Sequence, residues 1–132
     1  MNLDYRSFHL NLLSHAYNNL LRTEPFNMAD IAPQDEEFLA QMNQLIDMGQ
    51  NHDENFFEFG QQLLCKLVRA YPEHVPYVSR DLFWFLGGEC LHYMPDEEIE
   101  QFQQLDELRF AAEDSGEDFN YEKERARILK LH

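Results

Sequence analysis

The sequence has few cysteines, glycines and prolines, and it has no long apolar run. Its 132 residues include two cysteines, five glycines and five prolines. Cys65 and Cys90 each lie in an apolar helical pattern and form no disulfide framework, so we expect buried free thiols in a reducing compartment. About 18 uninterrupted apolar residues would be needed to span a membrane, and no basic stretch near the first residue precedes an apolar one. These absences predict a cytoplasmic protein without a membrane segment or an export signal.

Basic residues are also scarce. Ten Lys and Arg stand against 25 Asp and Glu, which gives a formal net charge of −15. Such a charge repels phosphate backbones and anionic lipid, so direct nucleic-acid and membrane binding are disfavoured. The same field favours a basic protein partner, because complementary potentials accelerate encounter and penalise wrong partners. Solubility is the other explanation of the charge.

Motifs of catalysis and cofactor binding are missing as well. Four serines are present and none lies in a Gly-x-Ser-x-Gly turn, while the Gly87–Gly88 pair lacks the Lys and Ser or Thr of a phosphate-binding loop. Cys90 follows an acidic residue inside an apolar segment, which does not activate a thiolate. We therefore predict no cofactor, and an enzyme is the less favoured class.

Apolar residues are plentiful, at 44% of the chain with 14% aromatics, so a packed core is expected. Apolar positions recur at steps of three and four over residues 4–22, from Pro33 to Gly49, and from about residue 53 to Pro72, which predicts three amphipathic helices. The loop after the first of them is expected to place Phe26, Met28 and Ile31 on the core. The fold class is all-α: one domain over residues 1–132, built as a bundle of about six helices.

The segment from Arg80 to Met94 is apolar on nearly every side, which predicts a buried aromatic helix at the centre of the bundle. Ser79 is the expected N-cap. Gly87 and Gly88 within the segment indicate a tight crossing or a kink, because each costs about 1 kcal/mol of helix propensity relative to Ala. Pro95 then begins a fifth helix, and the break around Gly116 leads to a short terminal helix over residues 120–131.

The acidic C-terminal third, residues 95–124, is the main candidate for function. Residues 96–124 hold twelve of the 25 acids and only two basic residues. Like charges this close repel one another beyond what solubility requires, which favours a surface for a basic partner. The predicted partner-binding residues are Asp96, Glu97, Glu98, Glu100, Asp106, Glu107, Glu113, Asp114, Glu117 and Asp118.

Glu89 and His92 are the sharpest chemical alternative. Their Glu-x-x-His spacing places both side chains on one helix face, as in carboxylate-bridged di-metal bundles. A second copy of the motif is required by such sites and is missing from the sequence. The pair therefore gives a metal-binding enzyme or carrier as the second hypothesis.

The first hypothesis is a small, acidic, non-enzymatic helical protein. It would bind a basic protein as an adaptor, inhibitor or regulator, and one version of this role is imitation of the charge pattern of a nucleic acid. A third hypothesis is a homodimer formed through exposed aromatics between Phe83 and Tyr93.

Overall fold

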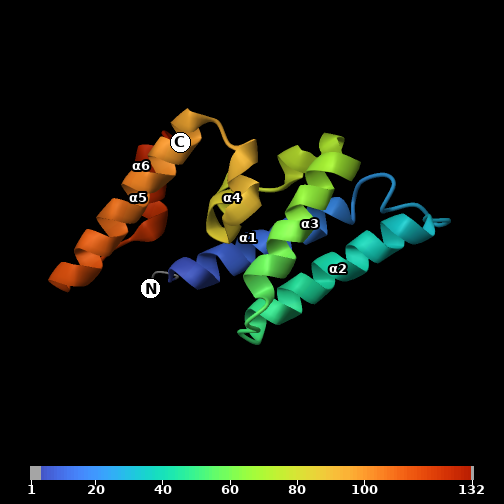
Figure 1. Cartoon of the computed structure of the whole chain (residues 1–132), viewed down its shortest axis with the longest axis horizontal. Coiled ribbons are helices and arrows are strands. Elements are labelled where there is room, and N and C mark those ends of the chain that lie inside the picture. The colour runs from blue at the N-terminus through green and yellow to red at the C-terminus, as the bar shows by residue number, and fades with distance from the viewer. Residues whose placement is uncertain (1–3, 132) are drawn as a thin grey trace.

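The computed structural model describes residues 4–131, which form six α-helices and two short 3₁₀ helices without any strand. The all-α bundle expected from the sequence is therefore confirmed, and Figure 1 shows its arrangement. The elements are α1 (Tyr5–Leu20), α2 (Pro33–Gln50), α3 (Phe56–Ala70), η1 (Pro72–Tyr77), α4 (Arg80–Leu86), η2 (Gly88–Tyr93), α5 (Asp96–Ser115) and α6 (Tyr121–Ile128).

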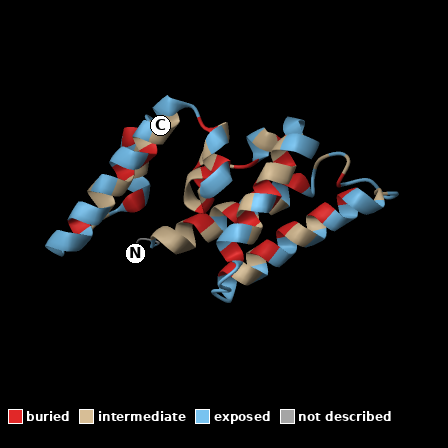
Figure 2. Cartoon of the chain, in the orientation of Figure 1, coloured by how far each residue is buried: buried red, intermediate tan, exposed pale blue. Residues whose placement is uncertain are grey.

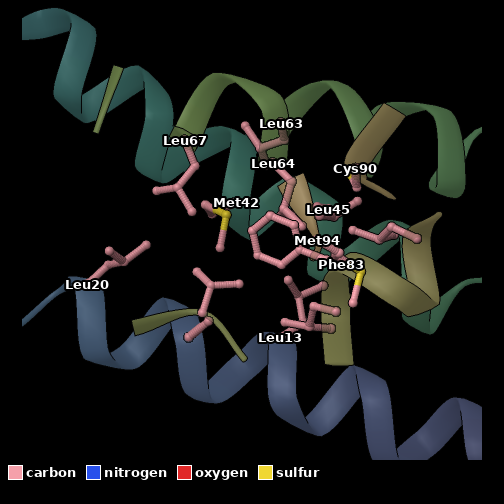
Figure 3. Close-up of a cluster of buried hydrophobic side chains, with 14 of the residues drawn as sticks. Leu13, Leu20, Met42, Leu45, Leu63, Leu64, Leu67, Phe83, Cys90 and Met94 are labelled. Carbon is pink, nitrogen blue, oxygen red and sulfur yellow. The ribbon is translucent and has the colours of Figure 1, made fainter. Parts of the chain in front are cut away.

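The core lies where α1, α2, α3 and α4 meet. Each of these helices contributes fully buried large side chains, such as Leu20, Phe38, Leu64 and Phe83. Figure 3 shows Phe83 among leucines from α1, α2 and α3, with Cys90 and Met94 beside it. Burying a side chain of this size contributes about 2 to 3 kcal/mol, so this cluster holds the helices together.

The predicted central helix is confirmed in its first half and wrong in its second. Ser79 caps it as expected, since its hydroxyl accepts a hydrogen bond from the backbone N–H of Asp81. The helix ends at Leu86, however, and residues 88–93 form a separate 3₁₀ helix. The reason is that Gly87 and Gly88 both have positive φ, at 68° and 57°, which no α-helix contains.

Replacing Gly87 by Ala is expected to lower the free energy of unfolding by about 1 to 3 kcal/mol. The backbone at Gly87, with φ 68° and ψ −151°, lies in a region that side-chain-bearing residues hardly populate. A Cβ there meets no atom closer than 3.8 Å, so strain of the backbone and not crowding is the cause. Urea denaturation measures the loss. An unchanged urea midpoint would contradict the claim that helix α4 ends through the positive φ of Gly87.

Gly60 in α3 marks a close approach of helices. A Cβ on Gly60 would lie 2.7 Å from the Cδ2 atom of Leu86, so α4 packs directly on the backbone of α3. The expectation for Met28 is wrong, because this side chain is 46% exposed. On α3, Phe56 takes the inward position, and Phe57 is 41% exposed and packs against Phe85.

The expected exposed aromatic surface between Phe83 and Tyr93 is also not present. Phe83 and Leu86 are buried, and Trp84 and Phe85 are half-buried against the chain's own core. These side chains pack within the chain's own core, so they do not form an exposed face for a second copy. No helix in residues 4–131 has both the length and the apolar character needed to cross a membrane.

Candidate partner-binding surface

Helix α5 carries most of the predicted surface, and its ends follow from the sequence. Pro95 is its N-cap, and Asp96, Glu97 and Glu98 occupy the first turn, where the helix dipole favours carboxylates. The helix stops at Gly116, which adopts the left-handed conformation with φ 72°. That turn sends the chain back along α5, so α6 packs beside it, as Figure 1 shows for the two helices labelled α5 and α6.

Two carboxylates of α5 bind groups of the adjoining segments. Arg80 donates from Nε to both carboxylate oxygens of Glu98 at 3.0 and 3.2 Å, and its second nitrogen donates to the carbonyl oxygen of Tyr93 at 2.7 Å. Trp84 donates its indole N–H to Asp106 at 2.9 Å, and its ring stacks on Phe102. Glu98 and Asp106 thus position α5 on α4, and their carboxylates already have partners within the chain.

A buried ion pair fixes α6 to α4. The guanidinium of Arg125 donates to both oxygens of Asp81, at 2.5 and 2.7 Å, and the Ser79 hydroxyl donates to the same carboxylate at 2.6 Å. Asp81 is only 1% exposed. Burial raises the pKa of this carboxyl, but the hydrogen bonds from Arg125 and Ser79 outweigh burial, so its pKa lies below the ordinary value. Asp81 is therefore charged, and its charge depends on Arg125.

Next to this pair lies a buried histidine surrounded by aromatic rings. His9 is fully buried, stacked on Phe85 with centroids 4.5 Å apart, and close to the rings of Tyr5 and Tyr121. Its Nδ1 lies 2.6 Å from the carbonyl oxygen of Tyr5. A carbonyl only accepts, so Nδ1 carries the hydrogen and Nε2, which has no partner within the described residues, is the unprotonated nitrogen.

We expect His9 to make the protein less stable as the pH falls. Burial lowers the pKa of His9 in the folded chain, in spite of the hydrogen bond to Tyr5, whereas the unfolded chain has a pKa of about 6.5. The unfolded state then binds more protons below that pH, so stability is complete above about pH 7.5 and falls through about pH 6. The effect on the free energy of unfolding is on the order of 1 kcal/mol at pH ~5.5.

Urea unfolding at pH ~7.5 and at pH ~5.5 measures this effect. The difference between the two pH values should shrink in His9→Leu and persist in His15→Gln, a change at an exposed position of the same helix. Because the readout is a difference within each variant, a general loss of stability in His9→Leu does not obscure it. Equal differences in the wild type and His9→Leu would mean that His9 does not control the pH dependence.

The ten predicted residues divide into two groups. Glu98 and Asp106 have the partners described above, and the other eight form no ion pair within residues 4–131 and are exposed. Figure 2 shows exposed residues along the length of α5 and around the turn that follows it. The eight exposed acids are Asp96, Glu97, Glu100, Glu107, Glu113, Asp114, Glu117 and Asp118.

Four of these acids lie on one face of α5. Steps of three and four residues along a helix keep side chains on one face. Such steps connect Asp96, Glu100, Gln103, Glu107, Phe110 and Asp114, so these side chains project in the same direction. Phe110 is 50% exposed and lies among Glu107, Asp114 and the flanking Glu113. We call these four acids with Phe110 the α5 acidic face. An exposed ring amid carboxylates offers a partner both apolar area and negative charge.

Sequence reasoning missed Phe110. Its position outside the buried stripe of Phe102, Leu105 and Ala112 is the signal that could have found it. The Arg109 Cζ atom lies 4.4 Å from the centroid of the Phe110 ring and 3.8 Å from that of Tyr5. The Arg109 guanidinium therefore packs against both the Phe110 ring and the ring of Tyr5 on α1.

A groove of about 500 Å³ opens between the end of α5, the following turn and α6. Leu108, Ala111 and Ala112 of α5 and the ring of Phe119 provide its apolar surface. The groove adjoins the acidic turn after α5 and lies on the same helix as the α5 acidic face. Its walls are therefore both apolar and acidic.

Glu89 and His92 lie elsewhere, on η2. The His92 Nε2 and a Glu89 carboxylate oxygen are 3.4 Å apart, and the two side chains are 75% and 77% exposed. Among the described residues, 4–131, no third His, Cys, Asp or Glu joins them in a group able to hold a metal ion. Cys65 and Cys90 are free thiols, and burial, with Cys65 nearby, raises the pKa of Cys90 to about 12. This region therefore offers no activated nucleophile at Cys90.

Comparison with known proteins identifies a family for the chain. The family described as PA2817-like matches residues 1–132, so the chain belongs to that family. No curated protein and no solved structure matches the chain.

Proposed function

We propose that this PA2817-like protein is a non-enzymatic helical protein that binds a basic protein through the acidic surface of α5, as an adaptor, inhibitor or regulator. The observation that carries the proposal is the state of the eight exposed acids, which have no cation paired with them in residues 4–131. A solubilising surface needs charge but not charge of one sign on one helix face. A basic partner relieves the repulsion among these acids by neutralising them.

The α5 acidic face fits this role in its composition. Interfaces are enriched in aromatic side chains at their centre and place charged groups at the rim, and Phe110 with its surrounding acids has that arrangement. The net charge of −15 adds long-range attraction that raises the rate of encounter with a basic surface. In one version of the proposal, the partner is a protein that normally binds nucleic acid, and α5 imitates the charge of a phosphate backbone.

The proposed site of action is the cytoplasm. Cys65 and Cys90 are free thiols, and Cys90 is buried. Free thiols of this kind fit a reducing compartment, in which disulfides do not persist.

Affinity capture at two salt concentrations tests the proposal. The immobilised protein is expected to retain basic proteins at ~50 mM NaCl and to release them at ~500 mM, because salt screens exposed charges beyond a few ångströms. Mass spectrometry identifies the retained proteins and their charge. Retention of no protein, or retention that salt does not change, would contradict binding through the acidic surface.

A further inference from the structure

The groove between α5 and α6 has exposed apolar area that a long basic side chain could cover. Ala111 and Ala112 contribute only methyl groups, and Leu108 and Phe119 lie half-buried beside them, so an apolar floor is left uncovered. The alkyl stem of an arginine or lysine covers such a floor while its charged end remains at the water boundary.

The rim of the groove supplies the charge that such a side chain needs. Glu117 and Asp118 line the groove, are exposed and form no ion pair within residues 4–131. Glu124 also lines the groove, and Arg127 already binds it at 2.7 Å. No lysine or arginine of the described part of the chain lines the groove, and the Arg127 guanidinium beside it is already paired with Glu124, so a cation entering the groove meets two unpaired carboxylates.

We propose that this groove is the site at which the basic partner inserts an arginine side chain. The inference rests on the proposed function and assigns one residue type of the partner to one site on the protein. The stem lies on Leu108 and Ala111, the guanidinium stacks on the Phe119 ring, and Glu117 and Asp118 accept its hydrogen bonds. Arginine fits better than lysine because its planar group both stacks on a ring and binds carboxylates through two parallel hydrogen bonds.

The test uses an acetylated and amidated hexa-arginine peptide as probe, with hexa-citrulline as its uncharged equivalent. Ala111→Trp fills the groove and leaves the net charge unchanged, and Ala111 is exposed, so the fold tolerates the larger ring. Asn43→Trp adds the same ring at an exposed position on α2, also without a change of charge. Calorimetry should show that Ala111→Trp weakens hexa-arginine binding about five- to tenfold, the contribution of one stacked and paired arginine.

Each outcome separates the two proposals. Binding by the wild type and Asn43→Trp but weaker binding by Ala111→Trp supports the groove. Equal hexa-arginine affinity in all three proteins overturns the groove while leaving the acidic surface in place. Equal binding of hexa-citrulline would mean that charge does not drive binding, and it would contradict both proposals. If the wild type does not bind hexa-arginine at ~50 mM NaCl, where exposed charges are little screened, the proposed function itself fails.

Discussion

Replacing Asp81 by Asn is expected to lower the free energy of unfolding by about 3 kcal/mol, at the lower end of the cost of breaking a buried ion pair. Asp81 is 1% exposed and binds both Arg125 and Ser79, so the amide leaves the Arg125 guanidinium largely buried without its counter-charge. The Arg125 side chain is 21% exposed, and partial hydration is the reason for the lower figure. Urea denaturation measures the loss.

The double variant Asp81→Asn, Arg125→Met provides the control. Removing both charges leaves no unpaired ion, so the double variant is expected to recover most of the stability that Asp81→Asn loses. Additive losses in the double-mutant cycle would contradict the assignment of this pair as the link between α4 and α6. Loss of the link should also loosen the packing of α5 on α4, where the Trp84 indole binds Asp106, and fluorescence of Trp84 can follow this change.

Removing four charges from and beside the α5 acidic face is expected to weaken binding of hexa-arginine on the order of 30-fold at low salt, from about 0.5 kcal/mol for each exposed charge. The changes spare Glu98 and Asp106, which hold α5 in place, and they spare the acids of the groove. Stability should change little, because the residues are exposed. The changes are Glu100→Gln, Glu107→Gln, Glu113→Gln and Asp114→Asn.

A second variant with the same net charge shows whether position matters. It neutralises four exposed acids on the other side of the chain, in the α1–α2 loop and α2, and should bind hexa-arginine nearly as well as the wild type. Equal weakening in both variants would mean that total charge attracts the probe and that α5 has no special role. The control changes are Glu24→Gln, Asp30→Asn, Glu37→Gln and Asp47→Asn.

Helix positions and ends could be read from the sequence where one local interaction decides them. Ser79 and Asn120 cap their helices through their own side chains, and Gly116 ends α5 because it adopts a left-handed conformation. The break at Gly87 was underestimated, because a glycine pair in an apolar run is compatible with either a kink or a change of direction. The fold takes the second, with positive φ at both glycines and Leu86 packed against the backbone of Gly60.

The surface was predictable in composition but not in geometry. The ten acids were recognisable from charge alone, whereas the inward use of Glu98 and Asp106 depends on where Arg80 and Trp84 lie after folding. The ion pair of Asp81 with Arg125 joins residues 44 positions apart, and no local pattern reveals it. The groove could not be foreseen either, because it exists only once α6 has folded back beside α5.

Mapping the backbone amides that respond to hexa-arginine is the most direct test of the central claim that α5 carries the binding surface. In ¹⁵N-labelled protein at ~50 mM NaCl, where exposed charges are little screened, shifts are expected in residues 96–118 and to vanish at ~500 mM. Shifts concentrated on α2 and α3, or spread evenly over the molecule, would contradict the claim.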